Sequence, residues 1–82
     1  MVSENNEKLK VLISKVLDIS KEAVTDETSP ESTPSWDSFN ALVMVSELED
    51  DFNVHFSMEE VLAVKCVKDI REALMRHGVE FK

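Results

Sequence analysis

The segment PSWDSFNALVMVSELEDDF, residues 34–52, decides the fold because it changes from loop to helix within a few residues. It opens on a proline, which blocks a preceding helix. Asp37 and Ser38 follow, and both residue types are favoured as helix N-caps. The apolar residues beyond them recur with helical spacing. The segment predicts a helix from about Ser38 to Asp51 or Phe52.

Two faces of this helix follow from a turn of about 100° per residue. The face expected to point into the core carries Ala41, Val45, Leu48 and Phe52, with Met44 at its margin. Phe39 and Val43 fall on the opposite side, among acidic residues, and are expected to face solvent. An apolar anchor ringed by carboxylates suits docking of a basic partner. The expected partner-binding residues are Phe39, Val43, Glu47 and Asp50. The alternative is that Phe39 folds back over the helix end and covers the loop.

The segment before this helix predicts one more helix and a long loop. A helix starting between residues 3 and 6 and ending near Leu17 places its apolar residues on one stripe. Residues 18–35 are mostly polar and carry Pro30 and Pro34, so they predict a loop. Long loops within a small domain are often functional. We expect Ile19 and Val24 to pack on the bundle and Trp36 to hold the loop in place.

The segment after residue 52 predicts two further helices. Ser57 and Glu60 form a capping-box pattern, which starts a short helix that ends near Val64. The last helix begins between residues 66 and 68 and stops at Gly78. Val79 and Phe81 are expected to fold back onto the bundle. The prediction is an all-α, four-helix bundle of three longer helices and a short third one. At 82 residues, the chain is expected to form one domain, residues 1–82.

The charge of the chain bears on its partners. Seventeen acidic residues against nine basic ones give a net charge of −8, which repels nucleic acid and favours partners with basic surfaces. Acidity of this kind also keeps a small protein soluble. With one cysteine, no intrachain disulfide can form. No signal peptide is visible and no apolar run reaches the roughly 20 residues of a membrane span. We expect a soluble, cytoplasmic monomer that binds neither nucleic acid nor membranes.

Sites for catalysis or metal binding are not supported by the sequence. His55 and His77 are the only histidines, and neither belongs to a nucleophile motif. The stretch DETSPESTPSWD has the length of a calcium loop but carries Pro30 and Glu31 where oxygen ligand and glycine are needed. Cys66 and the two histidines lack zinc spacing. The chain is therefore not expected to be an enzyme.

The segment WDSFNALVMVSELEDDF resembles the phosphopantetheine attachment segment of acyl carrier proteins. That family has Asp-Ser-Leu at a helix start and a Leu-Glu-acid-acid-Phe ending. The stretches VLDISKEAVTDET and NVHFSMEEVLAVKCVKDIREAL are similar to the flanking parts of the same family. Phe39 stands where the family usually has leucine, and Val43 stands where many fatty-acid carriers have an acid. The Trp-Asp-Ser form resembles stand-alone carriers of specialised gene clusters.

The resemblance implies covalent attachment of 4′-phosphopantetheine, taken from coenzyme A, to Ser38. A phosphopantetheinyl transferase would supply Mg²⁺ and the base, and Asp37 would cap the helix and help position the hydroxyl or the metal. The terminal thiol of the group would then carry an acyl group as a thioester. Further partners would be a loading ligase or transferase and synthase enzymes of fatty-acid, polyketide or related biosynthesis. Two alternatives remain: an aminoacyl or peptidyl carrier, and an unmodified acidic adaptor that binds partners through the helix of residues 38–52.

The acyl group has two possible locations. A cavity between the second and third helices could shelter it, lined by Leu48, Phe52, Val61, Leu62 and Val64. The same residues could instead close into a dry core, which we expect for the unloaded protein.

Overall fold

The computed structural model describes residues 4–81, and its helices are those predicted from the sequence. Each α-helix begins and ends within about one residue of its expected bounds. One short 3₁₀-helix, η1, was not predicted. The elements in chain order are α1 (Glu4–Leu17), η1 (Lys21–Ala23), α2 (Ser38–Phe52), α3 (Met58–Ala63) and α4 (Val67–Arg76). Within the described part of the chain there is no strand and no helix long and apolar enough to cross a membrane.

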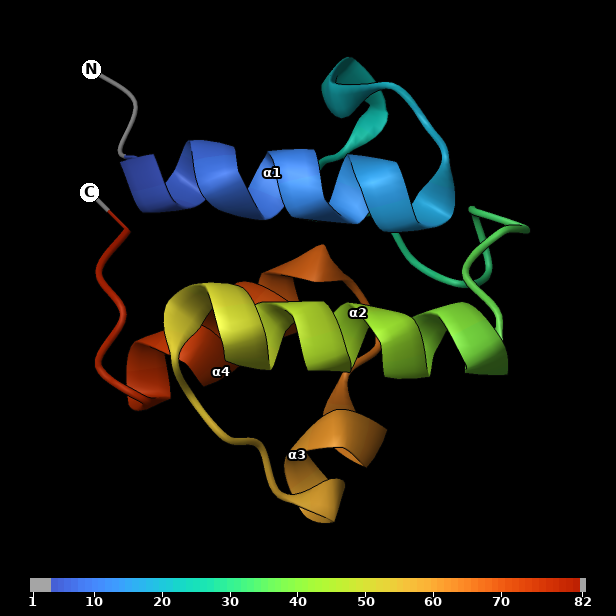
Figure 1. Ribbon diagram of the computed structural model, residues 1–82. Coiled ribbons are helices and arrows are strands. Elements are labelled where there is room, and N and C mark those ends of the chain that lie inside the picture. Colours follow the sequence, from blue (N-terminus) through green and yellow to red (C-terminus); the bar gives the residue numbers. More distant parts are fainter. Residues whose placement is uncertain (1–3, 82) are drawn as a thin grey trace.

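The helices α1 and α2 lie side by side, with α4 behind α2 and the short α3 beyond it (Figure 1). The core forms where the apolar stripes of α1, α2 and α4 meet. Burying these stripes is the main source of stability in so small a domain. The buried apolar residues of the three helices are Leu9, Leu12, Ile13, Leu17, Met44, Leu48, Val67, Ile70, Ala73 and Leu74.

The orientation of α2 differs in one respect from the prediction. Met44, expected at the margin of the inward face, is fully buried together with Leu48, whereas Ala41 and Val45 are only partly buried. Val43, expected in solvent, is half-buried. Because α1 covers the flank of α2 that carries Val43, this side chain lines a groove between the two helices.

The long loop between α1 and α2 is held by buried apolar side chains and by hydrogen bonds. The side chain of Trp36 is buried, as expected, and Val24 belongs to the same core cluster. The hydroxyl of Thr28 accepts from the backbone N–H of Thr25 and donates to the carbonyl of Ala23. The loop carbonyl of Thr28 also accepts from the N–H of Val67 at 2.9 Å, which satisfies a donor at the start of α4. The loop is therefore fixed relative to the bundle.

The segment after α4 turns back along the bundle towards α1, as predicted (Figure 1). Gly78 has a φ of +94°, a conformation that glycine adopts without strain. Phe81 then packs near Phe52 of α2, with ring centroids 6.3 Å apart. The ammonium of Lys8 lies over the Phe52 ring, 4.9 Å from its centroid. These contacts hold the end of α2 that lies far from Ser38.

Candidate functional site

Ser38 is the first residue of α2, and its side chain is exposed. The residue before it, Asp37, is the N-cap: its Oδ1 accepts a hydrogen bond from the backbone N–H of Asn40 at 2.8 Å. The backbone carbonyl of Asp37 accepts from Ala41 at 2.9 Å, which starts the helical ladder. The predicted N-cap is confirmed. The hydroxyl of Ser38 is thus held in solvent at the mouth of a regular helix.

The loop that leads into α2 is fixed on the core side. The side chain of Trp36 is only 6% exposed, and its backbone N–H donates to the carbonyl of Thr33 at 2.9 Å. The amide of Asn40 donates to the carbonyl of Ser35 at 2.7 Å, which ties the first turn of α2 back to the loop. These contacts give the Ser38 hydroxyl a fixed position relative to the bundle.

The surroundings of Ser38 fit a covalently attached phosphate. The N–H groups of Ser38 and Phe39 belong to the first turn, whose donors have no intrahelical acceptor. The positive end of the helix dipole lies at the same place and stabilises negative charge. A phosphodiester on the Ser38 oxygen would therefore sit beside donors that already point outwards.

The residues expected to bind partners lie around Ser38, but they do not all share one surface. Phe39 is 72% exposed, and Glu47 and Asp50 are exposed as well. The half-buried Val43 lies in the groove between α1 and α2, as do Phe39 and Glu47. Asp50 lies outside that groove. The predicted face is therefore one wall of a groove, with an additional carboxylate beside it.

A second exposed apolar surface was missed by the sequence analysis. Leu42 of α2 is 63% exposed, and Met58 and Leu62 of α3 are also largely exposed. On a helical wheel of α2, Leu42 lies outside the inward arc, about 60° from Phe39. The sequence could therefore have predicted that Leu42 is exposed. Leu62 was expected to line a cavity but faces solvent. The helix α3 has only six residues, and the side that it turns to the cavity carries Glu60 and Val61 instead.

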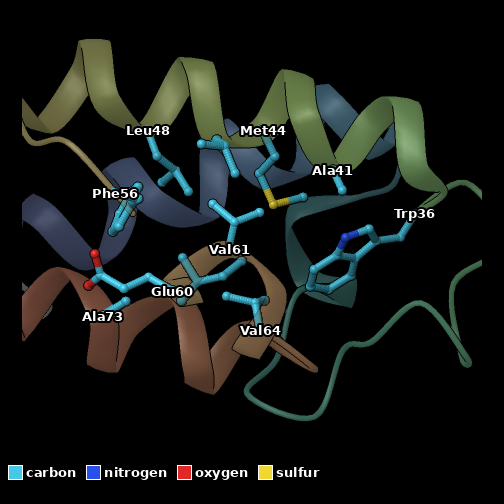
Figure 2. Close-up of a pocket in the computed structure, with 11 residues that line it drawn as sticks. Trp36, Ala41, Met44, Leu48, Phe56, Glu60, Val61, Val64 and Ala73 are labelled. Atoms are coloured by element: carbon cyan, nitrogen blue, oxygen red, sulfur yellow. The ribbon is translucent and has the colours of Figure 1, made fainter. Parts of the chain in front are cut away.

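An apolar cavity of about 60 Å³ lies between α2, α3 and α4 (Figure 2). Three of the five residues expected to line it do so: Leu48, Val61 and Val64. Phe52 and Leu62 do not, since Phe52 packs against Phe81 and Leu62 faces solvent. The sequence analysis missed the other lining residues, namely Trp36, Ala41, Met44, Val45, Phe56, Glu60, Ile70 and Ala73.

Glu60 is the one charged residue among those that line this cavity. It is the third residue of α3, and it completes the predicted capping box: the hydroxyl of Ser57 accepts from the Glu60 N–H, and the Glu60 carboxylate accepts from the Ser57 N–H at 2.9 Å. The same carboxylate lies 2.9 Å from Nε2 of His77. The hydrogen bond from the Ser57 N–H and the contact with His77 hold the pKa of Glu60 below its ordinary value.

The second histidine, His55, lies at the surface. Its side chain is 91% exposed and its Nδ1 lies 3.3 Å from the carboxylate of Glu49, which also accepts from the Phe56 N–H. Cys66 is the N-cap of α4 and makes no capping hydrogen bond with its side chain. Among residues 4–81, no group of three or more histidine, cysteine or acidic side chains is placed to hold a metal ion.

Comparison with known proteins gives two matches and one negative result. Residues 7–74 match the family model described as "Phosphopantetheine attachment site". Among solved structures, the fold is similar to a chain provisionally described as an acyl carrier protein from Mycobacterium tuberculosis, with a TM-score of 0.77. The two chains are 21% identical, and the match covers 87% of this chain and 95% of the other. No curated protein matches the sequence significantly.

Proposed function

The chain belongs to the phosphopantetheine-attachment family, and on that premise we propose that it is a carrier protein modified on Ser38. The family carries 4′-phosphopantetheine as a covalent prosthetic group. When bound, this group supplies a terminal thiol that holds an acyl group as a thioester. The proposed function is to move that acyl group between the enzymes of a fatty-acid, polyketide or related biosynthetic pathway.

One observation carries the assignment of Ser38. Its hydroxyl is exposed at the first residue of α2, inside the segment that the family model matches. Ser46, the other serine of α2, is also exposed but lies in the interior of the helix, where every backbone N–H has a helical partner. Ser38 alone in this helix combines an accessible hydroxyl with free N–H groups and the positive end of the dipole.

Each neighbour of Ser38 has a separate role in this proposal. Asp37 fixes the start of the helix and so the place of Ser38 in its first turn. In this proposal its carboxylate also helps a transferase orient the nucleophile or a Mg²⁺ ion. Trp36 anchors the loop in the core, so that the hydroxyl keeps its position when an enzyme approaches.

The proposed partners are a phosphopantetheinyl transferase and the enzymes that load and process the acyl group. Phe39 offers them an exposed aromatic ring directly beside the attachment point. Glu47 and Asp50 add negative charge on the same helix, and the chain has a net charge of −8. Surfaces with complementary charge attract one another during encounter, so the partner surfaces are expected to be basic.

One second function is favoured by a specific observation. Phe39, Leu42 and Leu62 are exposed apolar side chains on neighbouring helices, and an unmodified adaptor could bind partners through them. Such an adaptor would keep the fold and the docking surface but would need no hydroxyl at residue 38. An aminoacyl or peptidyl carrier differs only in the group that is loaded, and loading assays with amino acids and fatty acids separate the two.

The test is the intact mass after incubation with coenzyme A, Mg²⁺ and a broad-specificity phosphopantetheinyl transferase. We expect the wild-type chain to gain the mass of one phosphopantetheine. Ser38→Ala should gain nothing, whereas Ser46→Ala, the matched serine of the same helix, should gain as much as the wild type. A wild-type chain that stays unmodified with several transferases supports the adaptor instead.

A further inference from the structure

An open groove of about 1030 Å³ lies between α1 and α2. It shares no lining residue with the apolar cavity between α2, α3 and α4, whose volume is only about 60 Å³. Phe39, the residue after Ser38, lines the groove. The groove is as large as typical sites for small ligands, which measure roughly 300–1,000 Å³. It therefore starts beside the attachment point and has room for a flexible chain.

The two helices that form the groove run in opposite directions (Figure 1). Lys8, near the start of α1, donates a hydrogen bond to the backbone carbonyl of Asp51, near the end of α2. Lys15 and Val16, near the end of α1, therefore lie at the same end of the groove as Phe39. The groove thus extends from the start of α2 to the place where Lys8 and Asp51 meet.

The positive charge of the groove near Ser38 comes from Lys15. Two lysines line the groove, and Lys8 is already bound to the carbonyl described above. Lys15 is exposed and makes no hydrogen bond or ion pair within residues 4–81. On the other side of α2, the helix α3 carries Glu59 and Glu60 and no basic residue. An anion on Ser38 therefore has Lys15 as a cation on the α1 side.

The order of groups along 4′-phosphopantetheine matches the order of residues along the groove. Next to its phosphate, the group has a carbon with two methyl substituents, followed by two amides and the thiol. Next to Lys15, the groove presents the half-buried side chains of Val16 and Val43, followed by the charged side chains of Lys8 and Glu47. The helix α2 advances about 14 Å from residue 38 to residue 47, at about 1.5 Å per residue. An arm of about four residue-sized units has a similar extended reach.

We propose that the groove between α1 and α2 holds the phosphopantetheine arm of the unloaded carrier. Lys15 binds the phosphate of the arm, and Val16 and Val43 contact its two methyl groups. Glu47 and Asp51 line the far end of the groove, where an apolar acyl chain would find no matching surface, so the site takes the arm and not its cargo. The proposal rests on the proposed function and adds the place where the arm lies.

The test is NMR on the unloaded protein after reaction with coenzyme A and the transferase, with the thiol of the arm kept reduced. Intact mass first shows that the arm is present. Nuclear Overhauser contacts from the two methyl groups of the arm are then read at methyl groups of the protein. Val16 and Val43 report on the groove. Val61 and Val64 report on the apolar cavity, and Leu62 reports on the exposed surface of α3. Val16 is the sharpest reporter, because it lies on α1 and is not a chain neighbour of the attachment point.

We expect contacts at both groove valines and none at the three other reporters. The methyl resonances of Val16 should also shift between the unmodified and the modified protein. In Lys15→Gln this shift should fall about twofold to fivefold, the range for the loss of a solvent-exposed ion pair. Added salt should reduce the wild-type shift as well, because it screens the contact between Lys15 and the phosphate. Lys10→Gln is the matched control: Lys10 belongs to α1 but does not line the groove, so this variant should keep the wild-type shift.

Contacts of the arm with Val61, Val64 or Leu62 instead of the groove valines would overturn the proposal, and so would an arm without contacts to any of them. An equal loss in Lys15→Gln and Lys10→Gln would also overturn it, because net charge and not Lys15 would then be responsible. A modified chain without the groove contacts removes only this proposal. A chain that gains no mass removes the proposed function first, and this proposal with it.

Discussion

The Asp37 carboxylate and the Asn40 backbone N–H are joined by a 2.8 Å hydrogen bond that spans the first turn of α2 and brackets Ser38. This bond fixes where the helix begins, and with it the place of Ser38 as the first residue of the helix. The same turn leaves the N–H groups of Ser38 and Phe39 open to an incoming phosphate. The Asp37 side chain therefore both caps α2 and sets where α2 presents Ser38.

Replacing Asp37 separates these two roles. Asp37→Ala removes the cap and should lower the free energy of unfolding by about 1 kcal/mol, the usual cost of losing an N-cap. Asp37→Asn keeps an acceptor for the Asn40 N–H and should be close to wild type in stability. Urea denaturation measures both. If Asp37→Asn nevertheless slows modification by the transferase, the carboxylate charge acts on the hydroxyl or metal beyond capping; equal rates would limit Asp37 to the cap.

Phe39→Ala should leave the stability almost unchanged, within about 0.5 kcal/mol, because the ring is largely exposed. It should slow modification or partner transfer, because the ring lies next to Ser38. Leu48→Ala is the control in the same helix: this buried side chain should cost about 2–5 kcal/mol. Thermal unfolding and transferase kinetics report the two effects. A loss of several kcal/mol in Phe39→Ala would contradict its assignment to the partner surface.

The acidic surface of α2 should matter for partner binding. Glu47→Lys combined with Asp50→Lys should weaken binding of the transferase, measured by calorimetry, and added salt should weaken the wild-type complex. A matched control is Glu27→Lys combined with Glu72→Lys, which makes the same change in net charge at exposed positions in the loop and α4. If both pairs weaken binding equally, net charge is responsible and the α2 surface has no special role.

The lowered pKa of Glu60 makes a prediction about acid stability. Because the folded protein binds this proton less tightly than the unfolded chain, the ionised carboxylate contributes stability above its ordinary pKa of 4.5. That contribution is lost as the pH falls through the lowered pKa of the folded state. The wild type should therefore lose more stability than Glu60→Gln between pH 5 and acidic conditions, as followed by urea midpoints at each pH. Parallel pH curves for the two proteins would contradict the assignment.

Most of the fold could be predicted from the sequence because local signals agree with the packing. Asp37, the Ser57 and Glu60 capping box, and Gly78 each specify a helix end through side-chain or backbone chemistry that acts within a few residues. The apolar stripe of α1 identified its buried face. Helix bounds and the class of fold followed from these features.

What could not be predicted depends on contacts between elements. Val43 is half-buried because α1 lies against that flank of α2, and Phe52 is turned towards Phe81 instead of the cavity. The contact between Glu60 and His77 joins residues 17 positions apart and follows from how α3 meets the end of α4. The helical wheel of one element contains no information on its neighbour, so these features appear only in three dimensions.

The most direct measurement locates the modification within the chain. After reaction with coenzyme A and the transferase, trypsin should release residues 22–65 as one peptide, which contains several serines that could compete with Ser38. Fragment ions of that peptide should place the added phosphopantetheine on Ser38 and on no other residue. Its presence on Ser35, Ser46 or any other side chain would contradict the central claim that the exposed hydroxyl at the mouth of α2 is the attachment point.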